Sequence, residues 1–437
     1  MNNGQNIPQG YKKTTIGFIP QGWEIKRLKT IVTPIKTFSY SRDKLSDNVQ
    51  TLIYIHYGDI HKSGEKYSVN LNVDRLPYLM DGILSENQIS ANDFPKLQSG
   101  DILLPDASED YDGIGHAWEL QNVGQQNVIG GLHTIAIRPN PQFVLLGYGS
   151  LMFYSWPVSK ALKRIAQGTK VYSISFNLID NIKILLPPLK EQQKIAEVLG
   201  TWDKAIEKQS QLIIKLELRK KGLMQQLLTG KKRLPGFSGE WRKVKLGDIC
   251  ERVTRKNTED NKNVMTISAQ RGFVVQTDFF NKSVASETLE SYYLVLKDEF
   301  CYNKSYSNGY PMGAIKRLSE ADKAVVTSLY ICFNVKSRIR VSIDYLSFYF
   351  DNGGLNRGLT KIANEGGRAH GLLNVTPTDF FRLAFNIPSF EEQTTIAKVL
   401  TAADREIELA QQKLELLRQQ KRGLMQQLLT GKKRVKL

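Results

Sequence analysis

The sequence predicts an α+β protein in which two globular modules alternate with two long helices of the coiled-coil type. The first observation is an internal duplication, since the stretch GLMQQLLTGKKR stands at residues 222–233 and again at 423–434. Matching residues continue backwards, at the same offset of 201, to Glu191 and Glu392 without a gap. This constant register predicts one long regular element in each half, because loops tolerate length changes and packed helices do not.

The second observation is the spacing of apolar residues within the duplicated stretch. Apolar side chains recur there in alternating steps of four and three residues, which predicts a coiled-coil seam. The seam positions that we expect to pair the helices and to meet partner subunits are Ile195, Leu199, Trp202, Ile206, Leu223, Leu227, Ile396, Leu400, Ile407, Leu424 and Leu428. Lys220 and Lys421 share one seam position. We expect their aliphatic stems to snorkel towards solvent, and the alternative is that they fix the register of the pair.

Capping signals flank both copies. Ser389 and Glu392 form an S-x-x-E capping box ahead of the second helix, prolines precede both helices, and Gly230 and Gly431 supply the terminating residues. Each helix is therefore expected to run for about 38 residues, or roughly 57 Å. The glycine that opens each copy of GLMQQLLTGKKR costs about 1 kcal/mol of helix propensity, which predicts a bend or a close backbone approach.

The segments ahead of the two helices are also related. WEIKRLKTI opens the first at Trp23 and WRKVKLGDI opens the second at Trp241, with matching apolar spacing. The expected strands are 52–57, 101–104, 134–138, 182–186, 264–267, 300–303, 329–335 and 381–385, and the expected helices between strands are 148–166 and 343–352. The predicted order is a lead-in (1–22), the first module (23–187), the central helix (188–230), a basic linker (231–247), the second module (248–388), the C-terminal helix (389–431) and a basic tail (432–437).

Composition limits the class of protein and of partner. The chain has 437 residues, 41% of them hydrophobic, and a mean hydropathy of -0.33. No apolar run approaches the ~18 residues of a membrane span, so we expect a cytoplasmic protein of two to three domains without a membrane contact. Three cysteines without a C-x-x-C pair are expected to be reduced thiols. The net charge of +17 favours a polyanionic partner, and nucleic acid is the commonest one.

The motifs of common catalytic sites are absent or broken. The GKK of each repeat lacks the first glycine and the hydroxyl residue of a phosphate-binding loop. Gly113 and Gly115 lack the third glycine of a dinucleotide-binding turn. Residues 140–143, NPQF, resemble the N-P-P-F/Y of adenine methyltransferases, but Gln142 breaks that motif. The five histidines show no metal-ligand spacing, so we expect neither a catalytic residue nor a bound metal.

Polar loops with basic and aromatic residues are the candidate DNA contacts. The loop KSYSNGY (304–310) follows a predicted strand, and KTFSYSRDK (36–44) and RVTRKN (252–257) stand just after the openings of the two modules. Lysines are expected to contact phosphates, whereas Arg, Asn, Ser and Tyr are expected to decide the base sequence. The alternative for each loop is a solvated turn. The candidates are Lys36, Tyr40, Arg42, Lys44, Lys163, Arg164, Lys170, Arg252, Arg255, Lys256, Asn257, Lys304, Ser305, Tyr306, Ser307, Asn308, Tyr310, Lys316, Arg317 and Arg368.

These motifs together resemble the specificity subunit of type I restriction-modification enzymes. The resemblance is carried by proline followed by E-Q-x-x-I-A-x-x-L at the start of both helices and by GLMQQLLTGKKR at their ends. It implies that two target recognition domains each read one half of an asymmetric, bipartite site in double-stranded DNA, and that the helices pair antiparallel as a spacer. It also implies two bound methyltransferase subunits, which use S-adenosylmethionine, and two restriction and translocase subunits, which use ATP and Mg2+. The chain itself would bind no cofactor and catalyse nothing.

Two other functions are compatible with the residues. One is a chain with its own modification activity, which binding of S-adenosylmethionine by the isolated chain would indicate. The other is a coiled-coil scaffold, or a DNA-binding protein outside any restriction-modification system. A scaffold would show no DNA binding or a salt-insensitive one, whereas phosphate contacts make affinity fall steeply with salt.

Overall fold

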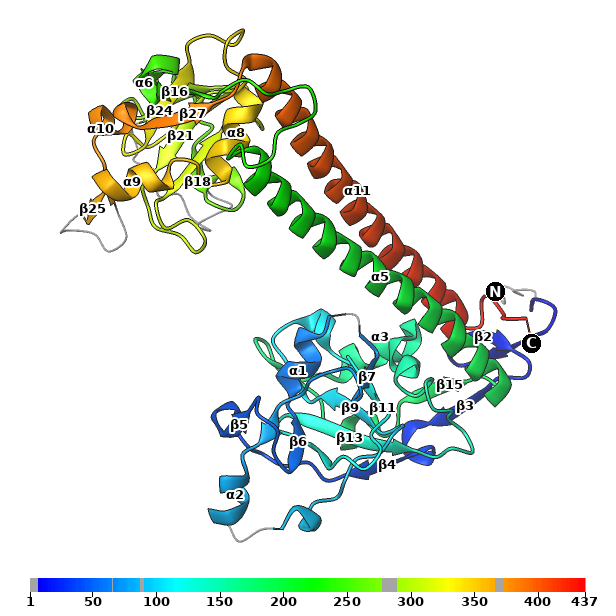
Figure 1. Cartoon of the computed structure of the whole chain (residues 1–437). Coiled ribbons are helices and arrows are strands. Elements are labelled where there is room, and N and C mark those ends of the chain that lie inside the picture. Colours follow the sequence, from blue (N-terminus) through cyan, green and yellow to red (C-terminus); the bar gives the residue numbers. More distant parts are fainter. Residues whose placement is uncertain (1–6, 65, 87–89, 277–288, 366–372, 437) are drawn as a thin grey trace. The chain divides into compact units, whose positions relative to one another are not determined.

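The computed structural model describes residues 7–64, 66–86, 90–276, 289–365 and 373–436, which belong to two compact units (Figure 1). The first unit comprises residues 1–209 and 413–437, and the second comprises residues 210–412. Each unit therefore combines one β-rich domain with parts of both long helices. The predicted α+β class, with two modules and two long helices, is confirmed. Within the described ranges, no helix has the length and apolarity needed to cross a membrane.

Two sheets form most of the first domain. Among the described residues, one sheet has the strand order β4-β13-β9-β11-β7 and the other the order β12-β6-β8-β5. Strand β9 is buried along its whole length because a core cluster covers each of its faces, with Ile102 and Leu104 in one cluster and Leu103 in the other. The strands of the first domain are β1 (Tyr11–Thr14), β2 (Gly17–Pro20), β3 (Glu24–Arg27), β4 (Val32–Ile35), β5 (Leu45–Ser46), β6 (Leu52–Ile55), β7 (Ser68–Asn70), β8 (Tyr78–Leu79), β9 (Ile102–Pro105), β10 (Ala107–Ser108), β11 (Trp118–Gln121), β12 (Val128–Gly130), β13 (Thr134–Pro139), β14 (Tyr172–Ser173) and β15 (Lys183–Leu186). Its helices are α1 (Tyr57–Lys62), α2 (Asp81–Glu86), α3 (Trp156–Ile165) and α4 (Phe176–Ile179).

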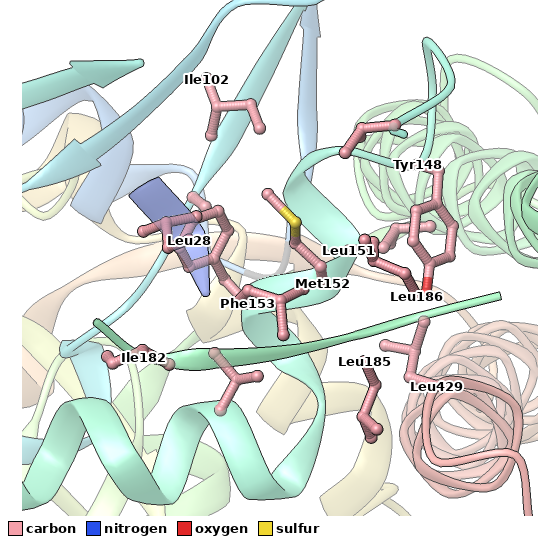
Figure 2. Packing of buried hydrophobic residues seen from close by; sticks show 14 of the residues in the cluster. Leu28, Ile102, Tyr148, Leu151, Met152, Phe153, Ile182, Leu185, Leu186 and Leu429 are labelled. Carbon is pink, nitrogen blue, oxygen red and sulfur yellow. The ribbon is translucent and has the colours of Figure 1, made fainter. Parts of the chain in front are cut away.

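The core of the first domain extends to the end of the second long helix, α11 (Phe390–Leu429). Figure 2 shows Leu429 of α11 near Leu185 and Leu186 of β15, with Tyr148 in the same buried cluster. The predicted helix 148–166 divides here into a 3-10 turn (Ser150–Tyr154) and α3. The C-terminal end of α11 is thus a structural part of the first unit.

A buried carboxylate holds the segment that leads into this 3-10 turn. Glu119 of β11 is 1% exposed, and its two oxygens accept hydrogen bonds from the backbone N–H groups of Gly147 and Ser150. Burial raises the pKa of Glu119 to about 7, while backbone N–H donors, among them those of Gly147 and Ser150, act in the opposite direction. Both carboxylate oxygens face donors, so a glutamine would place its NH2 group against an N–H group.

We expect the stability of the first unit to fall as pH rises through about 7. The folded protein binds the Glu119 proton more tightly than the unfolded chain does. This contribution is therefore complete below the unfolded pKa of about 4.3 and is lost as pH rises through the folded pKa. The difference between the folded and the unfolded pKa corresponds to roughly 4 kcal/mol at about 1.4 kcal/mol per pKa unit. Urea unfolding at pH 5 and pH 8 should show this loss in the wild type and lack it in Glu119→Gln, which is also less stable at both pH values. The same pH dependence in both proteins would contradict the assignment.

The second domain has smaller sheets. Among the described residues, the largest has the order β17-β24-β21-β22, and the pairs β16-β27, β18-β19, β20-β23 and β25-β26 form separate two-stranded sheets. The strands are β16 (Arg242–Lys245), β17 (Cys250–Val253), β18 (Met265–Ser268), β19 (Gly272–Val275), β20 (Tyr293–Leu296), β21 (Phe300–Asn303), β22 (Ala314–Arg317), β23 (Lys323–Val326), β24 (Ile331–Val335), β25 (Asn364–Glu365), β26 (Leu373–Asn374) and β27 (Ala384–Ile387). The helices are α6 (Leu246–Ile249), α8 (Ile343–Asp351), α9 (Asn356–Ile362) and α10 (Pro377–Arg382).

Two boundaries of the second domain differ from the sequence prediction. The predicted strand 381–385 is replaced by α10 and then β27, because the Thr376 hydroxyl accepts the N–H of Asp379 and caps a helix that Pro377 begins. The predicted basic linker ended at residue 247, yet it contains β16, which pairs with β27. The sequence prediction missed this strand because its lysines and arginine gave the segment the charged composition of a linker.

The two long helices run as predicted, α5 over Leu189–Leu227 and α11 over Phe390–Leu429. Gly230 and Gly431 follow them with φ values of 70° and 71°, the left-handed conformation of a helix cap. The predicted capping box forms only in part. Glu392 donates its N–H to Ser389 Oγ, but its carboxylate binds Arg233 instead of closing the box. A Cβ at Gly222 or Gly423 would meet no described atom within 4 Å, so the predicted close backbone approach is absent there.

The helices pair antiparallel, and the seam lysines take part in the pairing. In the first unit Lys421 binds Asp203, and in the second unit Lys220 binds Asp404. The two ion pairs are equivalent at the offset of 201, because each links one copy's lysine to the other copy's aspartate. The expectation of snorkelling stems was wrong for Lys421, which is 1% exposed. Such pairs favour one register of the two helices.

The remaining repeated residues join the helix pair to the domains. Arg434 donates two hydrogen bonds to Glu191 in the first unit, and Arg233 donates two to Glu392 in the second. Both glutamates are 1% exposed, so each arginine neutralises a buried charge. The glutamines that follow them, Gln192 and Gln393, accept backbone N–H groups of their domains at 2.9 Å. The start of one copy is therefore held by the end of the other.

Candidate nucleic-acid interface

The loop after β21 presents polar and aromatic groups on the surface of the second domain. The Asn303 side chain accepts the N–H of Ser305 at 3.0 Å, and Tyr310 donates its N–H to Ser307 O at 2.8 Å across a turn at Gly309. Gln270 Nε2 donates to the backbone oxygen of Asn308 at 3.1 Å. These bonds order the loop without using the side chains of Tyr306 and Asn308. Both side chains are exposed, Tyr306 to 62%.

The base of this loop is held by buried charge. Lys316 Nζ lies 2.7 Å from Asp351 Oδ1 and 3.4 Å from the Tyr310 hydroxyl. Burial pulls the pKa of Lys316 down, but Asp351 and Tyr310 together hold it above the ordinary value, so the amine stays charged. Burial also lowers the pKa of Lys304. The next residue, Arg317, binds Asp344 at 2.5 Å. Lys316 thus supports the loop at Tyr310, whereas Arg317 is engaged by Asp344 within the domain.

The predicted segment 252–257 is largely engaged within the second domain. Arg255 forms two hydrogen bonds to Glu299, which is buried, and Lys256 Nζ donates to the backbone oxygen of Ser291 at 2.6 Å. Asn257 is 1% exposed and uses both ends of its amide in a turn with Asn261. Arg252 is exposed and makes no ion pair with a described residue.

In the first domain, a tyrosine hydroxyl positions the predicted segment 36–44. Tyr54 Oη accepts the backbone N–H groups of Tyr40 and Leu132 and donates to Phe38 O at 2.6 Å. Lys36 lies 5.4 Å from the Phe38 ring and is exposed, while Lys44 is half-buried. The hydroxyl of this core tyrosine therefore fixes the backbone that carries the basic residues.

This segment also forms an ion pair, and a contact between a histidine and an aspartate lies close to it. Arg42 binds Asp59 at 2.6 Å. His133 has a φ of 53°, its Nδ1 lies 3.0 Å from Asp106, and its ring lies 5.4 Å from the ring of Tyr57. Positive φ at a residue other than glycine is uncommon and often marks a functional position. The sequence analysis did not single out His133 or Tyr57, because a positive φ and ring packing leave no signal in residue spacing.

The other predicted residues of the first domain lie on or just after α3. Lys163 binds Asp112 at 2.6 Å and lies 5.3 Å from the Tyr111 ring, and the hydrogen bond to Lys163 lowers the pKa of Asp112. Arg164 and Lys170 are exposed. The prediction for Arg368 falls outside the described residues.

The residues predicted to pair the helices are buried or half-buried, and six of them belong to the core clusters of the two domains. Ile195, Leu199, Ile396, Leu400, Leu227 and Leu428 are all at most 2% exposed, while Trp202, Ile206, Leu223, Ile407 and Leu424 are half-buried. Among the described residues, no group of three or more His, Cys, Asp or Glu side chains is placed to hold a metal ion. The Cys301 and Cys332 thiols face each other across β21 and β24 at 3.1 Å.

Comparisons with known proteins cover nearly the whole chain. The model of the type I restriction modification DNA specificity domain matches residues 20–218 and again 238–419. The putative type I restriction enzyme MjaX specificity subunit of Methanocaldococcus jannaschii is 26% identical over 98% of this chain and 97% of its own length. The type I restriction enzyme MjaVIII specificity subunit of the same organism is 25% identical over 82% of this chain and 85% of its own.

One solved structure shares the fold at low sequence identity. It comes from a study of the structural basis of complex assembly and conformational transition of the type I R-M system. Its TM-score is 0.55 at 15% identity, with 94% of this chain and 99% of that chain covered.

Proposed function

Because this chain belongs to the type I restriction-modification DNA specificity family, we propose that its two domains each read one half of a bipartite, asymmetric DNA site. The observation that carries the proposal is the combination of a duplicated frame with different loops. The helix ends and their Glu–Arg joints are equivalent in both units, whereas the ordered loops on the two domains differ in sequence and contacts. Two equivalent helical supports that carry different loops are suited to the recognition of two different half-sites.

The proposed assignment of base and phosphate contacts follows from the hydrogen bonds that order the loops. Tyr306, Ser307 and Asn308 in the second domain and Tyr40 and Arg42 in the first would meet bases, because their surroundings hold them in ordered loops. The proposed phosphate contacts are Lys36, Lys44, Arg164, Lys170, Arg252, Lys256 and Lys304. Four other candidates of the second domain would make internal contacts that hold the loops in place. They are Arg255, Asn257, Lys316 and Arg317.

The proposal extends to the complex. Two methyltransferase subunits would dock on the helix pair and use S-adenosylmethionine to methylate adenine, and two restriction subunits would use ATP and Mg2+. As a member of a non-catalytic subunit family, this chain would supply recognition and the gap between half-sites. Methylation-aware sequencing of DNA from cells that express the chain with a type I methyltransferase subunit tests this directly. A new methyladenine motif of two short blocks with a fixed gap supports the proposal, and no new motif from an assembled complex refutes it.

Asn308→Ala is expected to impair recognition of one half-site only. The backbone oxygen of Asn308 accepts the Gln270 bond, so removing the side chain leaves the loop order intact. Loss of a base contact costs about 1–3 kcal/mol, or roughly 5- to 150-fold in affinity. Fluorescence anisotropy with duplexes altered in one block or the other should show that the variant tolerates changes in one block alone. A comparison of the affinities of Tyr306→Phe and Tyr306→Ala distinguishes the contribution of the Tyr306 hydroxyl from that of its ring. Equal weakening on all duplexes would instead indicate a contact with the DNA backbone.

A further inference from the structure

A cavity of about 750 Å³ lies within the second unit, at the C-terminal end of α5. Its lining includes buried apolar residues, among them Leu355, Leu383 and Phe385, and exposed cations from two elements. Lys243 comes from β16, and Arg357 and Lys361 come from α9. Cavities of this size commonly hold a ligand.

The three cations have no acidic partner within the part of the chain that the structure describes. Among the described residues, Lys243, Arg357 and Lys361 form no ion pair, and no aspartate or glutamate is part of the cavity lining. The fourth cation, Arg233, is already neutralised by Glu392. Arg357 and Lys361 are four residues apart on one helix face, where like charges repel each other. The arrangement therefore favours an anion from outside the chain.

The first unit has a different surface at the equivalent place. Ile25 and Leu185 pair there across β3 and β15, and the equivalent pair across β16 and β27 is Lys243 and Asn386. Leu185 is buried, whereas Lys243 and Asn386 are exposed. An apolar pair in one unit is thus replaced by a polar, cationic pair in the other.

The first unit also carries a cover that the second lacks. The hairpin β1–β2 packs on the end of α11, where Tyr11 Oη donates to Gly431 O at 2.8 Å and Pro20 contacts Gly431. Lys183 of β15 reaches Thr15 in this hairpin at 2.8 Å. In the second unit the described segment between α5 and β16 contains no strand. The end of α5 is left beside the open cavity.

The equivalent tryptophans show the same contrast. In the first unit Trp23 Nε1 donates to Glu191 at 2.9 Å. In the second unit Trp241 lines the cavity, and its buried Nε1 has no hydrogen-bond partner among the described residues. A buried donor without an acceptor costs free energy, which an acceptor at this site would recover.

We propose that this cavity is a docking site for an acidic segment of the methyltransferase subunit. The identity of the partner rests on the proposed function, whereas the acidic character follows from the cavity. Carboxylates would pair with Lys243, Arg357 and Lys361, and apolar side chains of the same segment would cover Leu383 and Phe385. A DNA backbone would use the cations but leave the apolar floor unfilled, so a protein segment fits better.

A cross-linking experiment in the assembled complex tests the occupant. Ala384 is exposed and lines the cavity, so a photoreactive benzoylphenylalanine at this position reports what lies inside it. In a complex of the purified chain, the methyltransferase subunit and a DNA duplex, mass spectrometry should find a cross-link to a segment rich in Asp or Glu. The same group at Arg340, which is exposed and outside the cavity, is the control. A cross-link to DNA, to a segment without acidic residues, or to nothing would overturn the proposal.

Charge reversal measures the contribution of the cations. Arg357→Glu with Lys361→Glu should weaken binding of the methyltransferase subunit by about tenfold or more in low salt, with a smaller loss in high salt. Arg340→Glu is the matched control, and circular dichroism confirms that each variant is folded. Reversal of the cross-linked acidic residues to lysine should restore binding to the double variant. Unchanged affinity in the folded double variant would overturn the docking site even if the wild-type complex methylates a bipartite motif. Conversely, a complex that shows the docking effect but methylates no motif would refute the proposed function alone.

Discussion

Insertion of one heptad into each long helix, after Gln209 and after Ala410, is expected to widen the gap of the recognised site by about three base pairs. Seven residues lengthen a helix by roughly 10 Å at 1.5 Å per residue, and DNA rises about 3.4 Å per base pair. Seven is the period of the seam, so the apolar positions stay in phase. The Glu–Arg joints at both ends are untouched.

The measurement is the methylation motif of cells that carry the lengthened chain and a methyltransferase subunit. We expect the same two blocks with a longer gap, and little methylation of the original motif. The matched control is a heptad in α5 alone. It should prevent Lys421–Asp203 and Lys220–Asp404 from forming together, because only one helix has moved its partner residues. An unchanged gap in the doubly lengthened chain would show that the helices do not set the spacing.

The second large effect is expected at Lys421 and Lys220, the two seam lysines. Substitution by alanine should lower the free energy of unfolding much more at Lys421 than at Lys220. The Lys421 side chain is 1% exposed, binds Asp203 and lies 4.0 Å from the Tyr67 ring. The Lys220 side chain is 24% exposed, binds Asp404 and lies 5.5 Å from the Phe348 ring. Lys421→Ala removes buried packing, a cation–π contact and an ion pair, and should cost roughly 2–4 kcal/mol. Lys220→Ala should cost less than about 1 kcal/mol, because solvent screens the more exposed pair.

Urea unfolding of the two single variants gives this comparison. Lys421→Met is the informative control, because it keeps the aliphatic packing and removes the charge. Its loss should be well below that of Lys421→Ala, since Asp203 is half-exposed and stays hydrated without its partner. Equal losses at positions 220 and 421 would show that burial does not govern the strength of these pairs.

Sequence alone was sufficient for the frame of this protein. The repeat GLMQQLLTGKKR, the steps of four and three, and the terminal glycines predicted two long helices whose observed ends lie within three residues of the predicted ones. Such signals are local, because a helix is specified by the spacing of neighbouring residues and by its caps. Strands such as β6, β13 and β21 were found for the same reason, since short apolar runs ended at turn residues.

Tertiary structure decided which polar residues are free to bind a partner. Arg255 and Asn257 look like DNA contacts in the sequence, but Glu299 lies far away in the chain and only folding brings it to Arg255. The distant Asp203 likewise determines that Lys421 is an ion-paired core residue instead of a snorkelling one. The cationic cavity depends on β16 and α9 lying together and on the lack of a hairpin that the first unit possesses. The sequence determined the helices and strands, because these depend on local periodicity, and its repeated motifs indicated the family. The partners of each charge depended on long-range packing, which no spacing in the chain records.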